Sequence, residues 1–195
     1  MNKLVIFDLM GVLFPENILE KKIGSIVDRK RIISFEDATE FFIHAKFKNN
    51  RLMKIISKYL LKIEKLFLKR TIIDPESDEI ISYLKNKYKL AIISDLPSNW
   101  GDYLINKYDL EESFDPILIS GKENASKKDK KIFEILLERT NIDPKNMFIV
   151  DDKKINLKNA ADFGIKTIWF KTQRDKFKFN PDHTVTSLKE LKKIL

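Results

Sequence analysis

Acids, hydroxyls and a lysine stand beside short apolar runs along the whole chain. They are Asp8 after Leu4–Phe7, Ser94 and Asp95 after Leu90–Ile93, Lys127 ahead of a helical pattern at Lys130–Arg139, and Asp151 and Asp152 after Met147–Val150. If the runs are parallel strands, their carboxyl ends meet at one edge of a sheet, and the polar groups converge there. The sequence therefore predicts one polar site assembled from distant residues.

The chemistry of such a site follows from its residue types. Carboxylates gathered from two strands repel one another unless a cation neutralises them. With oxygen donors only, a hard ion such as Mg²⁺ is the natural occupant. A hydroxyl and a lysine opposite the ion would complete a binding site for a phosphoryl group. Asp8 can then act as a nucleophile, as carboxylates do in aspartyl-phosphate chemistry.

Each residue also has an ordinary structural interpretation. A single Asp or Ser after a strand is commonly a turn former or a helix cap. Lys127 lies in a lysine-rich run and, taken alone, is typical of a solvated surface. The case for chemistry depends on the coincidence of all these groups, in order, at strand ends.

The elements that must position these groups are short β-rich runs separated by segments of helical period. The predicted strands are Leu4–Phe7, Leu90–Ile93, Ile117–Ile119, Met147–Val150 and Lys166–Phe170, and the predicted helices are Ser77–Lys87, Trp100–Lys107, Lys130–Arg139 and Ile155–Phe163. Continuous apolar strands that alternate with helices predict an α/β fold with a doubly wound, Rossmann-like parallel sheet covered on both faces.

One region breaks this alternation. Between residues 14 and 73 no run reads as a strand, whereas residues 35–47 and 52–68 have apolar residues at helical spacing. Pro75, beside the helix-start residue Ser77, marks the return to the alternating pattern. We therefore predict a core domain of residues 1–13 and 74–195, with a helical insertion over residues 14–73.

The composition narrows the classes of function. The absence of cysteine excludes disulfides, thiolate catalysis and cysteine-bound zinc, and it fits a cytoplasmic location. The net charge of +8 comes from lysines interleaved with acids, which is typical of a solvated surface, so no nucleic-acid partner is expected. No segment approaches the roughly 20 apolar residues that cross a bilayer, so no membrane partner is expected. Asp8 interrupts the first apolar run, which we interpret as a strand rather than a signal peptide.

The order of these groups resembles that of the haloacid dehalogenase-type hydrolase superfamily, most of whose members are Mg²⁺-dependent phosphatases. The four matching stretches are Phe7-Asp8-Leu9-Met10-Gly11-Val12-Leu13, Leu90-Ala91-Ile92-Ile93-Ser94, Lys127-Lys128-Asp129-Lys130-Lys131-Ile132-Phe133, and Phe148-Ile149-Val150-Asp151-Asp152 with Asn156, Ala160 and Gly164. The resemblance spans the whole chain, and it implies that the insertion is a helical cap over the active site.

The resemblance also implies a role for each matched residue. Asp8 would attack phosphorus, and its other oxygen would bind Mg²⁺. Asp151, together with Asp152, would complete the metal site. Ser94 would donate a hydrogen bond to the phosphoryl oxygens, and Lys127 would neutralise Asp8 and the transferring group.

The first stretch departs from the family pattern, because Met10 stands where phosphatase relatives carry a second acid. That acid protonates the leaving oxygen and later activates water, a contribution of about 10²- to 10⁴-fold. Met10 can do neither, but it keeps the backbone carbonyl that is normally a metal ligand. Asp95, assigned to substrate binding beside Ser94, and Glu16 are candidate substitute acids, and each can also be a turn or cap residue.

Three functions follow in order of preference. The first is an Mg²⁺-dependent phosphatase that acts on a small phosphorylated metabolite through an aspartyl-phosphate. The second is a catalytically weak or inactive relative that binds a phosphorylated ligand or a partner. The third is a 2-haloacid dehalogenase, which the paired acids Asp151 and Asp152 argue against, since those enzymes lack them, use no Mg²⁺ and carry Tyr in place of Met10.

Overall fold

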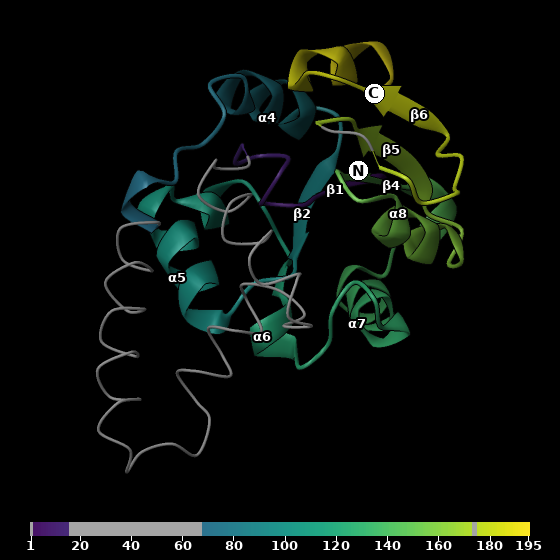
Figure 1. Ribbon diagram of the computed structural model, residues 1–195, viewed down its shortest axis with the longest axis horizontal. Helices are drawn as coiled ribbons and strands as arrows, with labels where there is room; N and C mark the ends of the chain where they lie inside the picture. Colours follow the sequence, from purple (N-terminus) through teal and green to yellow (C-terminus); the bar gives the residue numbers. More distant parts are fainter. Residues whose placement is uncertain (1, 16–67, 173–174) are drawn as a thin grey trace. The chain divides into compact units, whose positions relative to one another are not determined.

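A computed structural model describes residues 2–15, 68–172 and 175–195 of the chain. The strands in these residues form one parallel sheet of six strands in the order β3-β2-β1-β4-β5-β6 (Figure 1). They are β1 (Leu4–Phe7), β2 (Lys89–Ser94), β3 (Ile117–Ile119), β4 (Met147–Asp151), β5 (Lys166–Phe170) and β6 (His183–Val185). The prediction of a doubly wound α/β sheet is confirmed.

The central strands are continuous apolar runs because both of their faces are covered. All four residues of β1 are buried. In the ladders on either side, Phe7 pairs with Ile92 of β2 and with Val150 of β4. The residue that follows Phe7 therefore emerges level with the last residues of both neighbouring strands.

Helices in the described part of the chain flank the sheet, with α4 and α5 on one side and α7 and α8 on the other (Figure 1). The helices and 3₁₀ turns are α4 (Ser77–Lys85), α5 (Ser98–Lys107), η1 (Leu110–Glu112), α6 (Ser120–Glu123), α7 (Lys130–Thr140), η2 (Pro144–Asn146), α8 (Lys154–Ala161) and η3 (Leu188–Lys193). The four predicted helices are confirmed, with ends shifted by at most two residues. Among the described residues, none of these helices has the length and apolarity that crossing a bilayer requires.

The core beneath α7 and α8 holds these helices against the sheet. Alternate residues of β1, Leu4 and Ile6, point to this face and pack in one cluster with Phe133 and Leu136 of α7 and Leu157 of α8. Each of these side chains is fully buried, which stabilises the fold by about 1.5–3 kcal/mol per side chain. This packing fixes the ends of the helices that face the carboxyl edge of the sheet.

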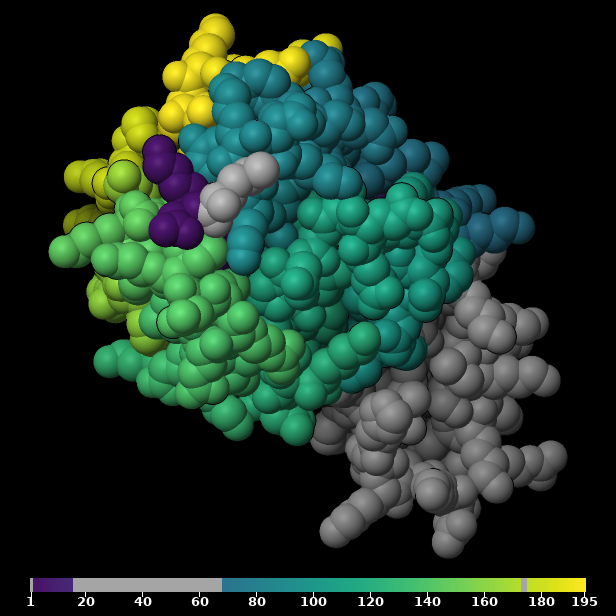
Figure 2. All heavy atoms as spheres, turned by 180° about the vertical axis from the view of Figure 1, so that it is seen from behind, coloured from purple at the N-terminus to yellow at the C-terminus, as the bar shows by residue number. Residues whose placement is uncertain are grey.

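The carboxyl-terminal segment closes the sheet and packs on α4. Leu188 and Leu191 of η3 are buried, and Lys192 Nζ lies 2.6 Å from Glu79 Oε1 of α4. Figure 2 shows the yellow atoms of this segment beside the blue atoms of α4. The ion pair is exposed and contributes little, so the buried leucines hold the two elements together.

Two compact units divide the chain, Met1–Pro15 with Ile73–Leu195 in one and Glu16–Ile72 in the other. The chain leaves the first unit after Pro15 and returns to it at Ile73. Inside this unit the two ends are joined by a hydrogen bond, in which the Asp74 N–H donates to the Leu13 carbonyl at 2.7 Å. The helices predicted at residues 35–47 and 52–68 lie outside the described residues except at Leu68, where the chain is helical as far as Arg70. The boundaries at residues 14 and 73 and the helical nature of the insertion therefore stay predictions.

Candidate active site

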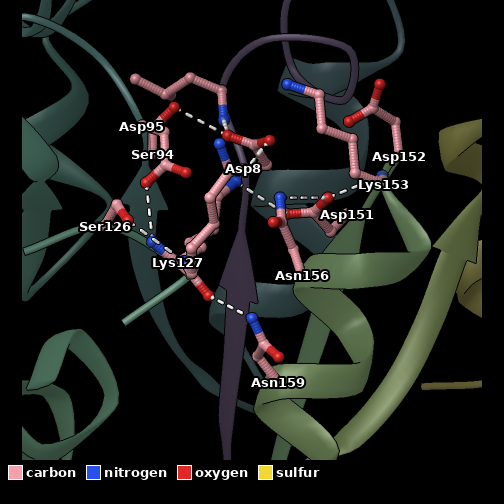
Figure 3. Close-up of polar contacts among 12 residues, drawn as sticks. Asp8, Ser94, Asp95, Ser126, Lys127, Asp151, Asp152, Lys153, Asn156 and Asn159 are labelled. Carbon is pink, nitrogen blue, oxygen red and sulfur yellow. Dashed lines mark hydrogen bonds and ion pairs between the residues drawn. The ribbon is translucent and has the colours of Figure 1, made fainter. Parts of the chain in front are cut away.

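The strand order places the site at the centre of the sheet. Strands β1 and β4 are neighbours there, and the connections leave them in opposite directions. In open α/β sheets, ligands bind at the carboxyl ends of strands related in this way. Asp8 follows β1, while Asp151 is the last residue of β4 and Ser94 the last of β2. These residues meet at one edge of the sheet (Figure 3).

Asp8 is buried and held by both of its carboxylate oxygens. Oδ1 accepts hydrogen bonds from the Leu9 N–H and from Ser94 Oγ, each at 2.7 Å. Oδ2 lies 2.6 Å from Lys127 Nζ. A carboxylate bonded in this way has one orientation, with a cation at one oxygen and two donors at the other.

Lys127 is 1% exposed and lies between two acids. Its Nζ is 2.6 Å from Asp8 Oδ2 and 2.7 Å from Asp151 Oδ2. Burial alone would lower the pKa of the ammonium, but the attraction of Asp151, Asp8 and Asp95 outweighs it and raises the pKa. The side chain therefore stays charged inside the protein.

Asp151 is the most fully bonded acid of the site. Its Oδ1 accepts from the Lys153 N–H at 2.7 Å, and Asn156 Nδ2 lies 3.1 Å from both carboxylate oxygens. Burial raises the pKa of Asp151, while the attraction of Lys127 opposes this rise. These bonds fix the carboxylate at the end of β4.

Asp152 differs because one of its oxygens is buried and has no hydrogen-bond donor. Among the described residues, its Oδ1 is the single buried side-chain nitrogen or oxygen of this kind. Burial raises the pKa of Asp152 to about 8, and the charges of Asp151 and Asp8 add to the rise. Leaving such an acceptor unpaired is costly, so this oxygen is suited to a ligand.

The turn after β1 approaches Asp152 closely at Gly11. The φ angle of Gly11 is +85°, and a Cβ atom there would lie 2.7 Å from Asp152 Cγ. From the other side, Trp169 Nε1 donates to the Asp152 backbone carbonyl at 2.9 Å. The position of Asp152 thus depends on a glycine and on a tryptophan from two other segments.

These residues fit a divalent metal ion. Carboxylate oxygens of Asp8, Asp151 and Asp152 lie within 4.8 Å of one another. A bound divalent ion would keep all three carboxylates ionised against the single charge of Lys127, and its charge would neutralise the excess of two negative charges. Carboxylate oxygens are the ligands that Mg²⁺ prefers, and the unbonded Oδ1 of Asp152 is free to become one.

The structure brings together five of the residues predicted from the sequence: Asp8, Ser94, Lys127, Asp151 and Asp152. Asp95 is half-buried beside them, with its Oδ1 2.9 Å from the Lys127 N–H. Met10 is 9% exposed in the turn after β1, where it forms a β-bridge with Phe14. Glu16 lies outside the described residues.

Two further residues contact the site, and the sequence analysis did not predict a role for either of them. Asn159 of α8 donates from Nδ2 to the Lys127 carbonyl at 3.0 Å, and Trp169 bonds the backbone of Asp152. The spacing of Asn156 and Asn159 was a usable signal, since residues three apart lie on the same face of a helix. Trp169 has no such signal, because an aromatic residue in an apolar strand is typical of a core.

Replacing Asp152 by Asn is expected to change how the stability of the metal-free protein depends on pH. Because the pKa of Asp152 is about 8 in the folded protein and 3.8 as the ordinary value, the folded state holds a proton that the unfolded state has lost between these values. Stability in the presence of a chelator should therefore fall as pH rises towards 8. Asp152→Asn should reduce this fall by about 3–6 °C of Tm per pH unit, given about 1.4 kcal/mol per unit and about 2–4 °C per kcal/mol for a chain of this size.

Thermal unfolding with a chelator and with Mg²⁺ checks this expectation. Asp152→Asn should also reduce the rise in Tm on addition of Mg²⁺. The matched control is Asp78→Asn, which makes the same chemical change at an exposed position of α4 and should leave both responses unaltered. Identical pH profiles for wild type and Asp152→Asn would contradict the burial argument.

Comparison with known proteins agrees with this fold. A family model described as haloacid dehalogenase-like hydrolase matches residues 5–170. The solved structure of a HAD phosphatase from Thermococcus onnurineus superposes with a TM-score of 0.69 at 22% identity, covering 98% of this chain and 97% of the other.

Curated relatives match a part of the chain. The phosphorylated carbohydrates phosphatase of Thermotoga maritima is 28% identical over 97 residues, covering 49% of this chain and 45% of the relative. The glyceraldehyde 3-phosphate phosphatase of Pyrococcus furiosus is 29% identical over 119 residues, covering 57% and 49%. The chain thus spans about half the length of these relatives. From the family match, which extends over most of the sequence, the chain belongs to the haloacid dehalogenase-like hydrolase family.

Proposed function

We propose that the protein is an Mg²⁺-dependent phosphatase that forms an aspartyl-phosphate at Asp8. The observation that carries this proposal is the bonding of Asp8. Its carboxylate is buried and oriented by Ser94 and Leu9 at one oxygen, and it faces the Lys127 ammonium at the other. This environment combines a fixed nucleophile with the positive charge that a phosphoryl group requires.

In the first step a carboxylate oxygen of Asp8 attacks phosphorus, and the bond from phosphorus to the substrate oxygen breaks. Ser94 Oγ and Lys127 Nζ, both in contact with Asp8, are placed to bind the phosphoryl oxygens. In the second step water attacks the same phosphorus, which regenerates the Asp8 carboxylate and releases inorganic phosphate. In the first step the leaving oxygen takes its proton from a water molecule, since Met10 has no proton to give. The hydroxide that remains takes up the proton that the attacking water loses in the second step.

Asp8, Asp151 and Asp152 would hold the Mg²⁺ ion, together with the backbone carbonyl of Met10. When bound, the ion supplies positive charge that offsets the charge of the carboxylates and of the phosphoryl group. Asn156 and the Lys153 N–H keep Asp151 oriented for this role. Trp169 does the same for the backbone of Asp152.

Phosphorylated sugars and triose phosphates are the first substrate class to test. Two curated relatives are named as phosphatases of phosphorylated carbohydrates and of glyceraldehyde 3-phosphate. The lysine-rich chain, with a net charge of +8, attracts small anions of this kind. We infer that the protein binds a small phosphorylated metabolite and that it acts in the cytoplasm.

A second candidate is favoured by one residue, Met10. If catalysis requires an acid at this position, the protein binds a phosphorylated ligand and turns it over weakly or not at all. The buried acids and Lys127 would be retained in either case, because they bind the ion and the phosphoryl group. The two candidates differ in turnover and share the ligand class.

A chelation experiment tests the metal requirement. With an aryl phosphate and a panel of sugar and triose phosphates, we expect phosphate release with Mg²⁺, loss of release with a chelator, and recovery when Mg²⁺ is added in excess. The reason is the buried excess of negative charge, which repels a phosphate ester when no cation is bound. Release at an equal rate with and without chelator would overturn the proposed metal requirement.

A further inference from the structure

Lys127 must be placed accurately although no regular element contains it. It lies between α6, which ends at Glu123, and α7, which begins at Lys130. A lysine side chain has a flexible four-carbon stem. The position of its ammonium between Asp8 and Asp151 therefore depends on how its backbone is held.

Both polar backbone groups of Lys127 are bonded to side chains from other parts of the core. The Lys127 N–H donates to Asp95 Oδ1 at 2.9 Å, and the Lys127 carbonyl accepts from Asn159 Nδ2 at 3.0 Å. Each bond joins residues 32 positions apart in the sequence. The contacts lie on opposite sides of one peptide segment (Figure 3).

The neighbouring hydrogen bonds of this segment are local. Asp129 Oδ2 accepts from the Ser126 N–H at 3.0 Å and from Ser126 Oγ at 2.9 Å. They shape the turn but join residues three positions apart, so they do not attach it to the sheet. The bonds from Asp95 and Asn159 do attach it.

The two attachment points lie close in sequence to residues that bond the acids of the site. Asp95 follows Ser94, which bonds Asp8. Asn159 lies three residues after Asn156, which bonds Asp151. The backbone of Lys127 is therefore attached beside the residues that orient Asp8 and Asp151, the two carboxylates that its ammonium contacts.

We propose that Asp95 and Asn159 are positioning residues that hold the backbone of Lys127 and so place its ammonium between Asp8 and Asp151. This inference rests on the proposed function, in which Lys127 binds the phosphoryl group. It assigns Asp95 a role as hydrogen-bond acceptor in place of substrate ligand or substitute acid. To the Lys127 N–H, Asp95 supplies an acceptor oxygen, and an Asn side chain supplies one as well.

The comparison of Asp95→Asn with Asp95→Ala tests this role. Asp95→Ala removes the acceptor and should lower kcat on an aryl phosphate by about 10- to 100-fold, as expected for a misplaced catalytic group. Asp95→Asn keeps an acceptor oxygen and should retain most of the wild-type rate. Equal losses in both variants would instead indicate an acid or charge role for Asp95 and overturn the proposal.

A double-mutant cycle with Lys127 shows whether Asp95 acts through it. If so, Asp95→Ala combined with Lys127→Met should be no slower than Lys127→Met alone. Losses that multiply would overturn the proposal.

Asn159→Asp keeps the shape of the side chain but removes the amide donor, so it should lower kcat. Its matched control is Asn106→Asp on α5, where an exposed amide donates to the Asp102 carbonyl of its own helix. The control should leave kcat unchanged. No loss in Asn159→Asp would remove Asn159 from the proposal.

Amide hydrogen exchange provides a measurement that needs no turnover. The Lys127 N–H should exchange faster in Asp95→Ala than in wild type, and Asp95→Asn should restore its protection. A wild type that releases no phosphate would overturn the proposed function. Equal exchange in wild type and Asp95→Ala would separately overturn the assignment of Asp95.

Discussion

Asp8→Asn is expected to abolish the release of phosphate from an aryl phosphate, with a loss of at least about 10³-fold in kcat, as for the removal of other catalytic nucleophiles. The amide of Asn is a poor nucleophile, and one of the two carboxylate oxygens becomes a donor group. In the folded protein both oxygens of Asp8 have assigned contacts, with Ser94 Oγ and the Leu9 N–H on one side and Lys127 Nζ on the other. The substitution therefore alters the reacting atom within a nearly unchanged shape.

The measurement combines steady-state rates with detection of the covalent intermediate. Phosphorylated protein, trapped by rapid acid quench and located by mass spectrometry, should be found at Asp8 in wild type and be missing in Asp8→Asn. Asp78→Asn at the exposed start of α4 is the matched control and should keep the wild-type rate. If wild type and Asp8→Asn release phosphate equally slowly, Asp8 is not the nucleophile and the proposed function fails.

Much of the fold could be predicted because the sheet is parallel and covered on both faces. Buried strands such as β1 must then be apolar throughout, which makes them visible as runs in the sequence. Strand β6 was missed because it lies at the edge of the sheet, where a strand need not be apolar throughout. Its residues His183 and Thr184 are exposed at the edge of the sheet, and Val185 alone is buried, so no apolar run marks it.

The candidate site was predictable as far as it depends on strand ends. Asp8, Ser94 and Asp151 meet because their strands are neighbours and point the same way. The contacts of Asp95 and Asn159 with the backbone of Lys127 were not predictable, since they depend on where an irregular segment passes over the sheet. The unbonded Oδ1 of Asp152 is likewise a property of the packed structure alone.

Met10→Asp is the substitution with the largest expected gain. An Asp at this position can protonate the leaving oxygen and activate water, which contributes about 10²- to 10⁴-fold when a side chain performs it. Met10 is 9% exposed in the turn after β1, two residues from Asp8, and it stands at the position where the resemblance to the phosphatases of the family expects this acid. The gain should depend on the leaving group, because an alkyl oxygen requires a proton and an aryl oxygen with a low pKa departs without one.

The decisive measurement is therefore the ratio of rates for an alkyl and an aryl phosphate in wild type and in Met10→Asp. We expect the alkyl rate to rise by about 10²-fold or more and the aryl rate to rise far less. Met10→Asn is the matched control, since it has the size of Asp but no proton to donate at neutral pH, and it should produce no such gain. Equal gains for both substrates would indicate an effect on binding or folding. If neither substrate gains, the missing acid at position 10 does not limit turnover, and the second candidate loses its support.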